Sequence, residues 1–502
     1  MNTNSGTHPY LSTQLAKYLL LLALALIPFL AWPFYGSGMF HSNVIQTESA
    51  VSVVSTVGPT PGFLWIWPRV LLVLFAGLIG LLLLPSGKRL PRSTFPWALV
   101  LYAMVVFIST VFANDDWSFK ILGGVNRLDG SLYQIGVVLF GIFAYGLTRA
   151  VSNKRKFIHV ILFIFAVSSG LETLIILMQR LGIDYIGMAL KGGSYGAPVG
   201  TIGNPGMVAG FLIIGVFSSI LLAEKAPDAR SKVLLYTLAT FVSIGVGISA
   251  NRSSMLAILT VLSLLLIVRR NGKSLFALSI FVLGAFAIAT YIPNTFAHSR
   301  NLASTQTGKT RLLIWKLAVE AITKTPGQPL IGAGPDGFLI TLETKIPIRE
   351  LLQEYRVEFG WSKDIKIADV KPLFTEKDPF RSRAFMVTLE NDPTPGKMHR
   401  IIYRYYLDKA HNLFLDRAVS YGILAAIIWL YLFLSPVFRL YRRKDTISLY
   451  LAGGVLALFI YYLAWFPIPQ TEPLHLTWLA VVWVWAETIA RNGQDNELSS
   501  AR

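Results

Sequence analysis

The sequence of 502 residues contains no cysteine. This absence excludes disulfide bonds, a thiol nucleophile and a metal site built on cysteine ligands. Polar segments of the chain must therefore be held by packing. Aromatic residues, which make up 13% of the chain, suit that purpose.

Signals for a metal or a nucleotide are also missing. The seven histidines include no pair at the His-x3-His spacing that zinc sites favour. The glycine-rich stretch 332–337 (GAGPDG) follows no predicted strand, so it indicates a turn and not a phosphate-binding loop. We therefore expect no metal and no cofactor.

Charged residues are scarce, at 14%, whereas hydrophobic residues reach 54% and the mean hydropathy is +0.55. These values are typical of an integral membrane protein. The apolar residues form runs that can each cross a bilayer as a helix of roughly 20 residues. About 12 such spans are predicted, at 18–34, 70–84, 97–112, 132–147, 157–178, 207–223, 233–250, 255–268, 275–292, 413–437, 448–466 and 476–490.

The predicted fold is an all-α, polytopic membrane protein with one large polar loop. Residues 1–292 are expected to form an N-terminal transmembrane bundle of about nine helices, and 413–502 a C-terminal bundle of about three. Residues 293–412 between them form the large, partly helical extracytoplasmic loop. The first run is long enough to be a retained helix instead of a cleaved signal peptide.

The formal net charge of +18 comes mostly from basic clusters in alternate inter-span connections. They lie at 88–92, 149–156, 225–232, 269–273 and 439–444, whereas the connections 35–62 and 467–474 carry no Lys or Arg. By the positive-inside rule, both termini are cytoplasmic and the large loop lies outside the inner (plasma) membrane. The basic charge thus indicates orientation among membrane lipids, not a nucleic-acid partner.

Two arginines are candidates for anion binding on the outer side. Arg252 begins a span at the face where basic anchors are not favoured, so it either snorkels to the interface or binds an anion. Arg311 lies on an amphipathic segment with apolar residues at helical spacing, where a solvated arginine is the alternative to a phosphate ligand. Both readings stay open on spacing alone.

His411 is the candidate base. The stretch from about 398 looks helical, which would put Asp408, at i−3, on the same face as the imidazole and able to orient it. The alternatives are an interfacial histidine with no task, or a capping site at which Asn412 interrupts the helix. Cations with a single base suit transfer from a diphosphate-linked donor, because arginines neutralise the leaving diphosphate while histidine accepts a hydroxyl proton.

Several short motifs, in order, resemble the bacterial O-antigen ligase and O-antigen polymerase superfamily. They are 124–130 (GVNRLDG), 201–205 (TIGNP), 251–253 (NRS), 311–315 (RLLIW), 332–334 (GAG), 411–414 (HNLF) and 421–423 (YGI). The resemblance spans most of the chain.

The resemblance implies transfer of a glycan from undecaprenyl diphosphate to an acceptor on the outer face of the inner membrane, without metal or nucleotide. It implies that Arg252 and Arg311 clamp the diphosphate and that His411 activates the acceptor. Substrate-binding roles for Arg127, Asn204 and Asn412 follow from it as well, whereas the same role for Asp408 is expected from its predicted position beside His411.

The leading hypothesis is therefore a ligase that attaches a glycan to a lipid A-core or similar cell-envelope acceptor. A polysaccharide polymerase and a protein O-oligosaccharyltransferase are the alternatives, with a glycan or a protein as the acceptor. A membrane transporter is the non-enzymatic alternative, although transporters place ionisable residues at mid-span and Glu172 is the main acid of that kind here.

Overall fold

The computed structural model describes residues 8–30, 43–47, 51–55, 61–85, 93–113, 117–123, 128–183, 198–268, 273–292, 306–324, 327–338, 340–341, 349, 353, 366–372, 384–390, 400–404, 409–443 and 445–500. Arg127 and Asp408 lie outside these residues.

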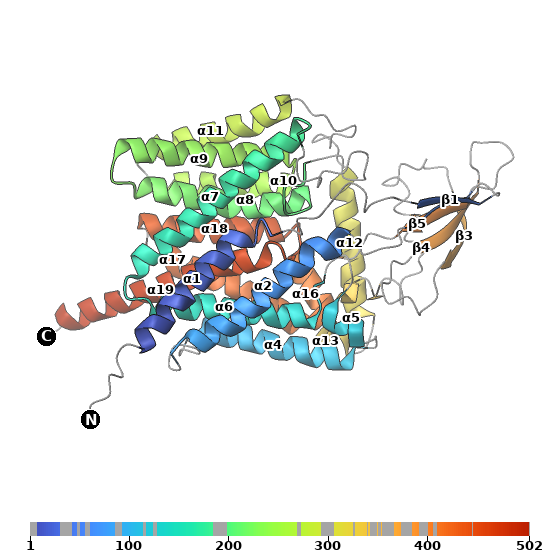
Figure 1. Cartoon of the computed structure of the whole chain (residues 1–502), viewed down its shortest axis with the longest axis horizontal. Coiled ribbons are helices and arrows are strands. Elements are labelled where there is room, and N and C mark those ends of the chain that lie inside the picture. Colours follow the sequence, from blue (N-terminus) through green and yellow to red (C-terminus); the bar gives the residue numbers. More distant parts are fainter. Residues whose placement is uncertain are drawn as a thin grey trace.

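The chain is mostly helical, because its apolar runs satisfy their backbone hydrogen bonds within helices (Figure 1). The N-terminal helices are α1 (His8–Leu26), α2 (Pro61–Leu83), α4 (Thr94–Phe112), α5 (Trp117–Leu122), α6 (Ser131–Ala150), α7 (Lys154–Arg180), α8 (Pro205–Glu224), α9 (Ala229–Ile248), α10 (Arg252–Val268) and α11 (Lys273–Tyr291). The later helices are α12 (Gln306–Thr323), α13 (Gln328–Ile331), α16 (Leu413–Tyr421), α17 (Ile423–Tyr441), α18 (Thr446–Tyr462) and α19 (Glu472–Ser500).

Membrane character is confirmed by the length and composition of these helices. Within the described residues, seven helices are long and apolar enough to cross a bilayer: α2, α4, α6, α7, α8, α9 and α17. Shorter apolar helices occur at Leu11–Leu26, Arg252–Val268, Leu275–Ala289 and Thr446–Tyr462. The chain is therefore a helical membrane protein, and the number of 12 spans stays a prediction.

The polar loop was predicted to be partly helical within an all-α fold, and the structure adds strands to it. It contains β3 (Lys366–Pro372), β4 (Ala384–Glu390) and β5 (Arg400–Arg404), which form an antiparallel sheet in the order β3-β4-β5. A hairpin of β1 (Asn43–Thr47) and β2 (Val51–Ser55) also forms, and β2 lies against β5. The helix expected from about 398 is wrong at 400–404, because Ile401, Ile402 and Tyr403 pair with β4.

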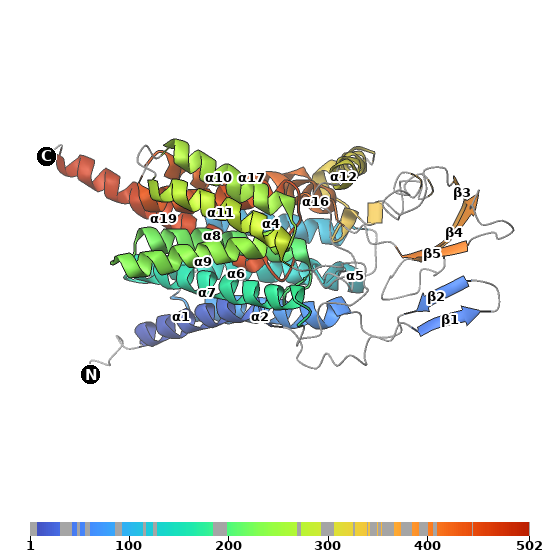
Figure 2. The same ribbon diagram turned by 90° about the horizontal axis from the view of Figure 1, so that it is seen from above.

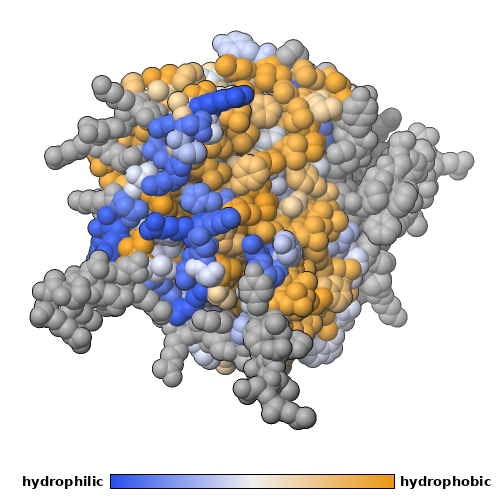
Figure 3. Space-filling model, turned by 60° about the vertical axis from the view of Figure 1, so that its left-hand side comes forward, coloured by the Kyte–Doolittle hydropathy of each residue, from blue (hydrophilic) through white to orange (hydrophobic). Residues whose placement is uncertain are grey.

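The strands lie beyond one end of the helical bundle, opposite the two chain termini (Figures 1 and 2). We call this the sheet end, and the opposite end the termini end. α12 lies across the bundle at the sheet end (Figure 1). Side chains exposed on the flank of the bundle are largely apolar, including Phe107 of α4 and Phe163 of α7, and one such hydrophobic face is visible in Figure 3.

α8 forms the centre of the bundle, since every residue from Pro205 to Ala223 is buried. It packs against α7, α9 and α18. The close approach is possible because glycines face its neighbours: a Cβ on Gly210 would lie 2.6 Å from the Tyr461 hydroxyl, and one on Gly215 would lie 2.2 Å from the Ser169 side chain. This central helix starts directly after Asn204, at the sheet end.

A buried polar cluster fixes the turn that leads into α8. Arg69 of α2 is fully buried and donates to the carbonyls of Ile27, Pro28 and Thr201, each at 2.8 Å. Glu172 of α7 accepts from the backbone nitrogen and the hydroxyl of Thr201, both at 2.7 Å. The mid-span acid is thus used to hold the 198–204 turn.

Replacing Arg69 with Met should remove about 3–5 kcal/mol of stability, because it leaves the Glu172 carboxylate and three carbonyls buried without their cation. Thermal denaturation in detergent should therefore give a clearly lower midpoint for Arg69→Met. Lys156→Met, at an exposed position on α7, is the control and should have the same denaturation midpoint as the wild type. Equal midpoints for the two variants would contradict this account of the cluster.

Candidate functional site

Arg311 of α12 points into the sheet end of the bundle. Its guanidinium lies over the Trp465 ring, 4.8 Å from the centroid. Its Nη1 donates to the carbonyl of Ala464, and the carbonyl of His411 lies 3.5 Å away. The predicted amphipathic helix is confirmed, and the side chain is half-buried instead of fully solvated.

His411 lies in the short connection before α16 and not on a helix, which corrects the expected helical setting. Its φ of +50° is in the left-handed region, unusual for a residue with a side chain. The carbonyl accepts from the Trp315 indole at 3.4 Å, so two side chains of α12 contact the His411 backbone. Such a conformation persists only where surrounding contacts impose it, and it is common at functional sites.

The His411 ring packs edge-on against two aromatic rings. Its centroid is 5.4 Å from that of Trp465 and 4.9 Å from that of Phe466. Those two rings are themselves stacked, with centroids 5.5 Å apart and planes 9° apart. The imidazole, like Arg311, is half-buried. Arg311 and His411, 100 residues apart in sequence, therefore both contact Trp465.

Asn412 caps a helix, as one of the alternatives for the His411 segment predicted. Its side-chain oxygen accepts from the backbone nitrogens of Phe414 and Leu415 at 2.9 and 3.1 Å and starts α16. Its amide nitrogen donates to the Leu463 carbonyl at 2.8 Å. Asn412 thereby ties the His411 segment to the segment that carries Trp465, and a direct role in substrate binding stays a prediction.

Two further helices begin beside Trp465. Asn204 caps α8 by accepting from the Gly206 nitrogen at 2.8 Å. A Cβ on Gly206 would lie 2.2 Å from the Trp465 ring and 2.9 Å from the Asn251 amide nitrogen. Arg252, the next residue, is exposed at the first position of α10. The structure therefore brings the segments of Asn204, Arg252, Arg311 and His411 to one place.

A buried ion cluster lies behind His411; we call Lys409, Asp129, Asp336 and Asp416 the Lys409 cluster. The Lys409 ammonium is 2.5 Å from Asp129 and 2.6 Å from Asp336, with Asp416 at 4.0 Å. Asp416 also accepts from the Ala410 nitrogen at 3.2 Å. Burial raises the pKa of Asp416, which lies on α16 outside the candidate spans, and the Lys409 ammonium opposes that rise.

A second buried pair lies one residue further along. Arg417 contacts Glu472 at 2.5 Å, and the Tyr133 hydroxyl donates to the other oxygen of this carboxylate at 3.0 Å. The guanidinium also lies over the Tyr102 and Trp429 rings, at 5.6 Å from each centroid. This pair joins α16 to the starts of α6 and α19.

Sequence reasoning did not select Trp465, Lys409, Asp129 or Asp336 as site residues. The motif 124–130 contains Asp129, and the predicted turn at 332–337 contains Asp336, where the positive φ of Gly332, Gly334 and Asp336 confirms a turn. The motifs thus contained Asp129 and Asp336, but the sequence did not indicate that both residues pair with Lys409. Arg127 and Asp408, outside the described residues, stay predictions.

The described residues contain no group of three or more His, Asp or Glu side chains arranged to hold a metal ion. The Lys409 ammonium lies between the carboxylates of Asp129 and Asp336. The arrangement offers cations and one imidazole.

A comparison with protein-family models finds no match for the chain, and a comparison with curated proteins finds none either. The family resemblance thus rests on the motifs and stays a prediction.

Replacing Lys409 with Met should destabilise the protein by about 3–5 kcal/mol, since three carboxylates would lose their shared buried cation. Thermal unfolding in detergent measures this loss. Lys324→Met is the matched control, because Lys324 pairs with Glu320 on an exposed helix surface and such pairs contribute less than about 1 kcal/mol. If the two variants unfolded at the same temperature, the Lys409 cluster would not hold the site.

Gly206→Ala tests the packing of Trp465. The new methyl group would overlap the indole ring, and overpacking of this kind costs about 1–3 kcal/mol. Gly284→Ala on α11, where an added Cβ meets nothing within 4 Å, should be neutral or slightly stabilising because alanine favours helix. A Gly206→Ala midpoint equal to that of Gly284→Ala would mean that Trp465 is not packed against α8.

Proposed function

We propose that this protein is a glycan transferase that moves a glycan from a polyprenyl diphosphate carrier to an acceptor hydroxyl at the sheet end of the membrane. The observation that carries the proposal is the convergence of Arg311 and His411 on Trp465, with both side chains half-buried. A permanent cation and a titratable base, held on one aromatic ring, form the minimum set for this reaction.

Arg311 suits the diphosphate of the donor. A guanidinium stays protonated and presents two parallel N–H groups to phosphate oxygens. One nitrogen of Arg311 is used on the carbonyls of Ala464 and His411, which fixes the direction of the fork. Exposed Arg252, on the segment next to Trp465, adds a second positive charge beside the leaving diphosphate.

His411 suits activation of the acceptor. The acceptor oxygen attacks the anomeric carbon of the glycan, and the imidazole takes the hydroxyl proton as the new carbon–oxygen bond forms. The anomeric carbon's bond to the diphosphate oxygen breaks, and the departing polyprenyl diphosphate keeps that electron pair. Arginine charge offsets the negative charge that develops on it.

The proposed orientation puts the sheet end outside the cell and both termini in the cytoplasm. It is supported by the connections between α6 and α7 and between α8 and α9, which lie at the termini end (Figure 1). Arg149 and Lys154 flank the first connection, and Lys225 lies within the second. Basic connections on one side are the expected signature of the cytoplasmic face.

The transporter alternative receives less support. Glu172, the main acid of the kind that transporters use, accepts two hydrogen bonds from Thr201 and interacts electrostatically with Arg69. It therefore has a structural task that accounts for its burial. A polymerase would use the same donor site, and only the reaction products separate it from a ligase.

His411→Ala should abolish transfer and leave the donor glycan on its carrier. The test is a gel of carrier-linked and acceptor-linked glycan from cells that lack the native gene and express wild type or the variant. Long polymer stranded on the carrier would identify a ligase, and stranded single repeat units a polymerase.

His159→Ala, on α7 at the termini end, is the matched control and should transfer glycan as the wild type does. An unchanged glycan pattern in His411→Ala would remove His411 from the mechanism and contradict the proposed function.

A further inference from the structure

Trp465 and Phe466 are two large apolar side chains just beyond the end of α18, and they are only 4% and 2% exposed. The helix ends at Tyr462, and Pro467 disfavours helical backbone at the residue before it. The chain therefore leaves the helix before these two rings. We call Trp465 and Phe466 the aromatic wall.

The Trp465 ring is fixed by neighbours from three helices. The Arg311 guanidinium of α12 lies 4.8 Å from its centroid, and the Tyr461 ring of α18 lies 6.3 Å away. On the α8 side, a Cβ on Gly206 would be 2.2 Å from the indole. Arg311 also donates to the Ala464 carbonyl next to the ring. The aromatic wall therefore has a defined position.

The wall covers one side of the His411 imidazole. The ring planes of Trp465 and Phe466 are inclined to the imidazole by 74° and 81°, with centroids 5.4 and 4.9 Å from it. The indole nitrogen, the one polar side-chain atom of the wall, is itself buried. A buried water needs about two to four polar partners, and ring carbons supply none. The wall therefore disfavours water on this side of His411.

This matters for a base that must act on an acceptor hydroxyl and not on water. The hydroxyl is positioned by binding of the rest of the acceptor molecule. A water molecule depends on hydrogen bonds made in the site itself. An apolar surface beside the base thus penalises water more than a tethered hydroxyl, and it suppresses hydrolysis as a side reaction.

We propose that Trp465 and Phe466 select the nucleophile: they exclude water from His411, so that the donor glycan is transferred to the acceptor instead of being hydrolysed. The proposal rests on the proposed transferase function and gives the aromatic wall a positioning and specificity role.

Loss of the wall leads to a defined side reaction. A water oxygen attacks the anomeric carbon, and His411 takes a proton from that water. The bond between the anomeric carbon and the diphosphate oxygen breaks, and its electron pair leaves with the polyprenyl diphosphate. The products are free glycan and polyprenyl diphosphate.

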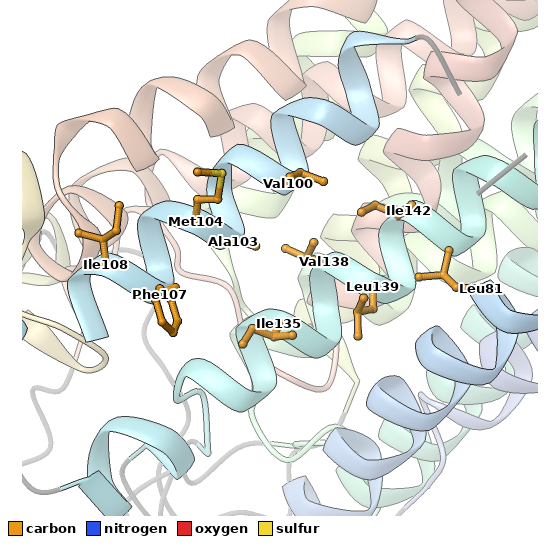
Figure 4. A pocket seen from close by; sticks show the side chains of 10 residues that line it. All are labelled: Leu81, Val100, Ala103, Met104, Phe107, Ile108, Ile135, Val138, Leu139 and Ile142. Carbon is orange, nitrogen blue, oxygen red and sulfur yellow. The ribbon is translucent and has the colours of Figure 1, made fainter. Parts of the chain in front are cut away.

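An apolar groove elsewhere in the bundle provides a comparison. It lies between α4 and α6, with Leu81 of α2 at one side, and its volume is about 580 Å³ (Figure 4). Phe107 lines it and is 63% exposed on the flank of the bundle. His411 and the aromatic wall are not among its lining residues. Removal of the Phe107 ring therefore changes apolar packing without opening space beside His411.

The experiment uses purified protein in liposomes with a polyprenyl diphosphate that carries a fluorescent oligosaccharide, with and without a glycolipid acceptor. Phe466→Ala and Trp465→Ala should release free oligosaccharide at least about tenfold faster than wild type, because water reaches the base. Trp465→Phe retains a ring and should transfer glycan with less release than Trp465→Ala. In heavy-oxygen water, the label should enter the freed glycan and not the diphosphate.

Three controls separate water exclusion from loosening of the fold. Phe107→Ala is matched to Phe466→Ala. Trp478→Ala, at a fully buried position on α19, is matched to Trp465→Ala. Both should release no more oligosaccharide than wild type, even where the denaturation midpoint falls. Adding His411→Ala to Phe466→Ala should abolish the release, because the attacking water then lacks its base.

Loss of transfer in both wall variants, with no released oligosaccharide, would reduce the wall to a structural role and overturn the proposal. Equal release by Trp478→Ala, or release that persists without His411, would overturn it as well. Variants that transfer glycan as wild type does, without release, would refute the wall alone. A wild type that transfers nothing to the acceptor would instead refute the transferase function on which the proposal rests.

Discussion

The ammonium of Lys409 holds together three segments that are far apart in the sequence: the start of α6 at Asp129, the turn at Asp336 and α16 at Asp416. Burying a cation with three carboxylates is costly unless every contact is close, so the cluster permits little variation in where the segments meet. Its position two residues before His411 transmits that constraint to the imidazole. The backbone of His411 is in the left-handed region, with a φ of +50°.

The opposite side of His411 is fixed by side-chain hydrogen bonds to backbone carbonyls. Asn412 donates to Leu463, and Arg311 and Trp315 approach the His411 carbonyl. Trp465 fills the space between α8 and α12, which only glycine at 206 allows. Three side chains therefore meet at the sheet end of the bundle: the guanidinium of Arg311, the imidazole of His411 and the indole of Trp465. The arrangement needs no mobile part to bring Arg311 and His411 together.

Much of this could be predicted from the sequence, and the limits have physical reasons. Apolar runs define helices because a bilayer forces backbone groups to pair internally, so α8 follows directly from composition. The predicted span 413–437, in contrast, is divided at Gly422 into α16 and α17. The strands within 366–404 were not predicted, because strand preference in short segments depends strongly on the strands with which they pair. Arg311 and His411 were found by their chemistry, but the ion pairs of Lys409 with Asp129 and Asp336 are tertiary, across up to 280 residues (409 minus 129). Trp465, at the end of an apolar run, looks like any interfacial tryptophan.

The central claim is that Arg311 and His411 serve glycan transfer from a polyprenyl diphosphate. Its most direct test is reconstitution of the purified chain in liposomes with a glycan-loaded polyprenyl diphosphate and a glycolipid acceptor, with release of free polyprenyl diphosphate measured against acceptor glycosylation. The account predicts that the two products appear in equal amounts and that neither forms without acceptor. Movement of the intact donor across the bilayer, with no bond broken, would contradict it.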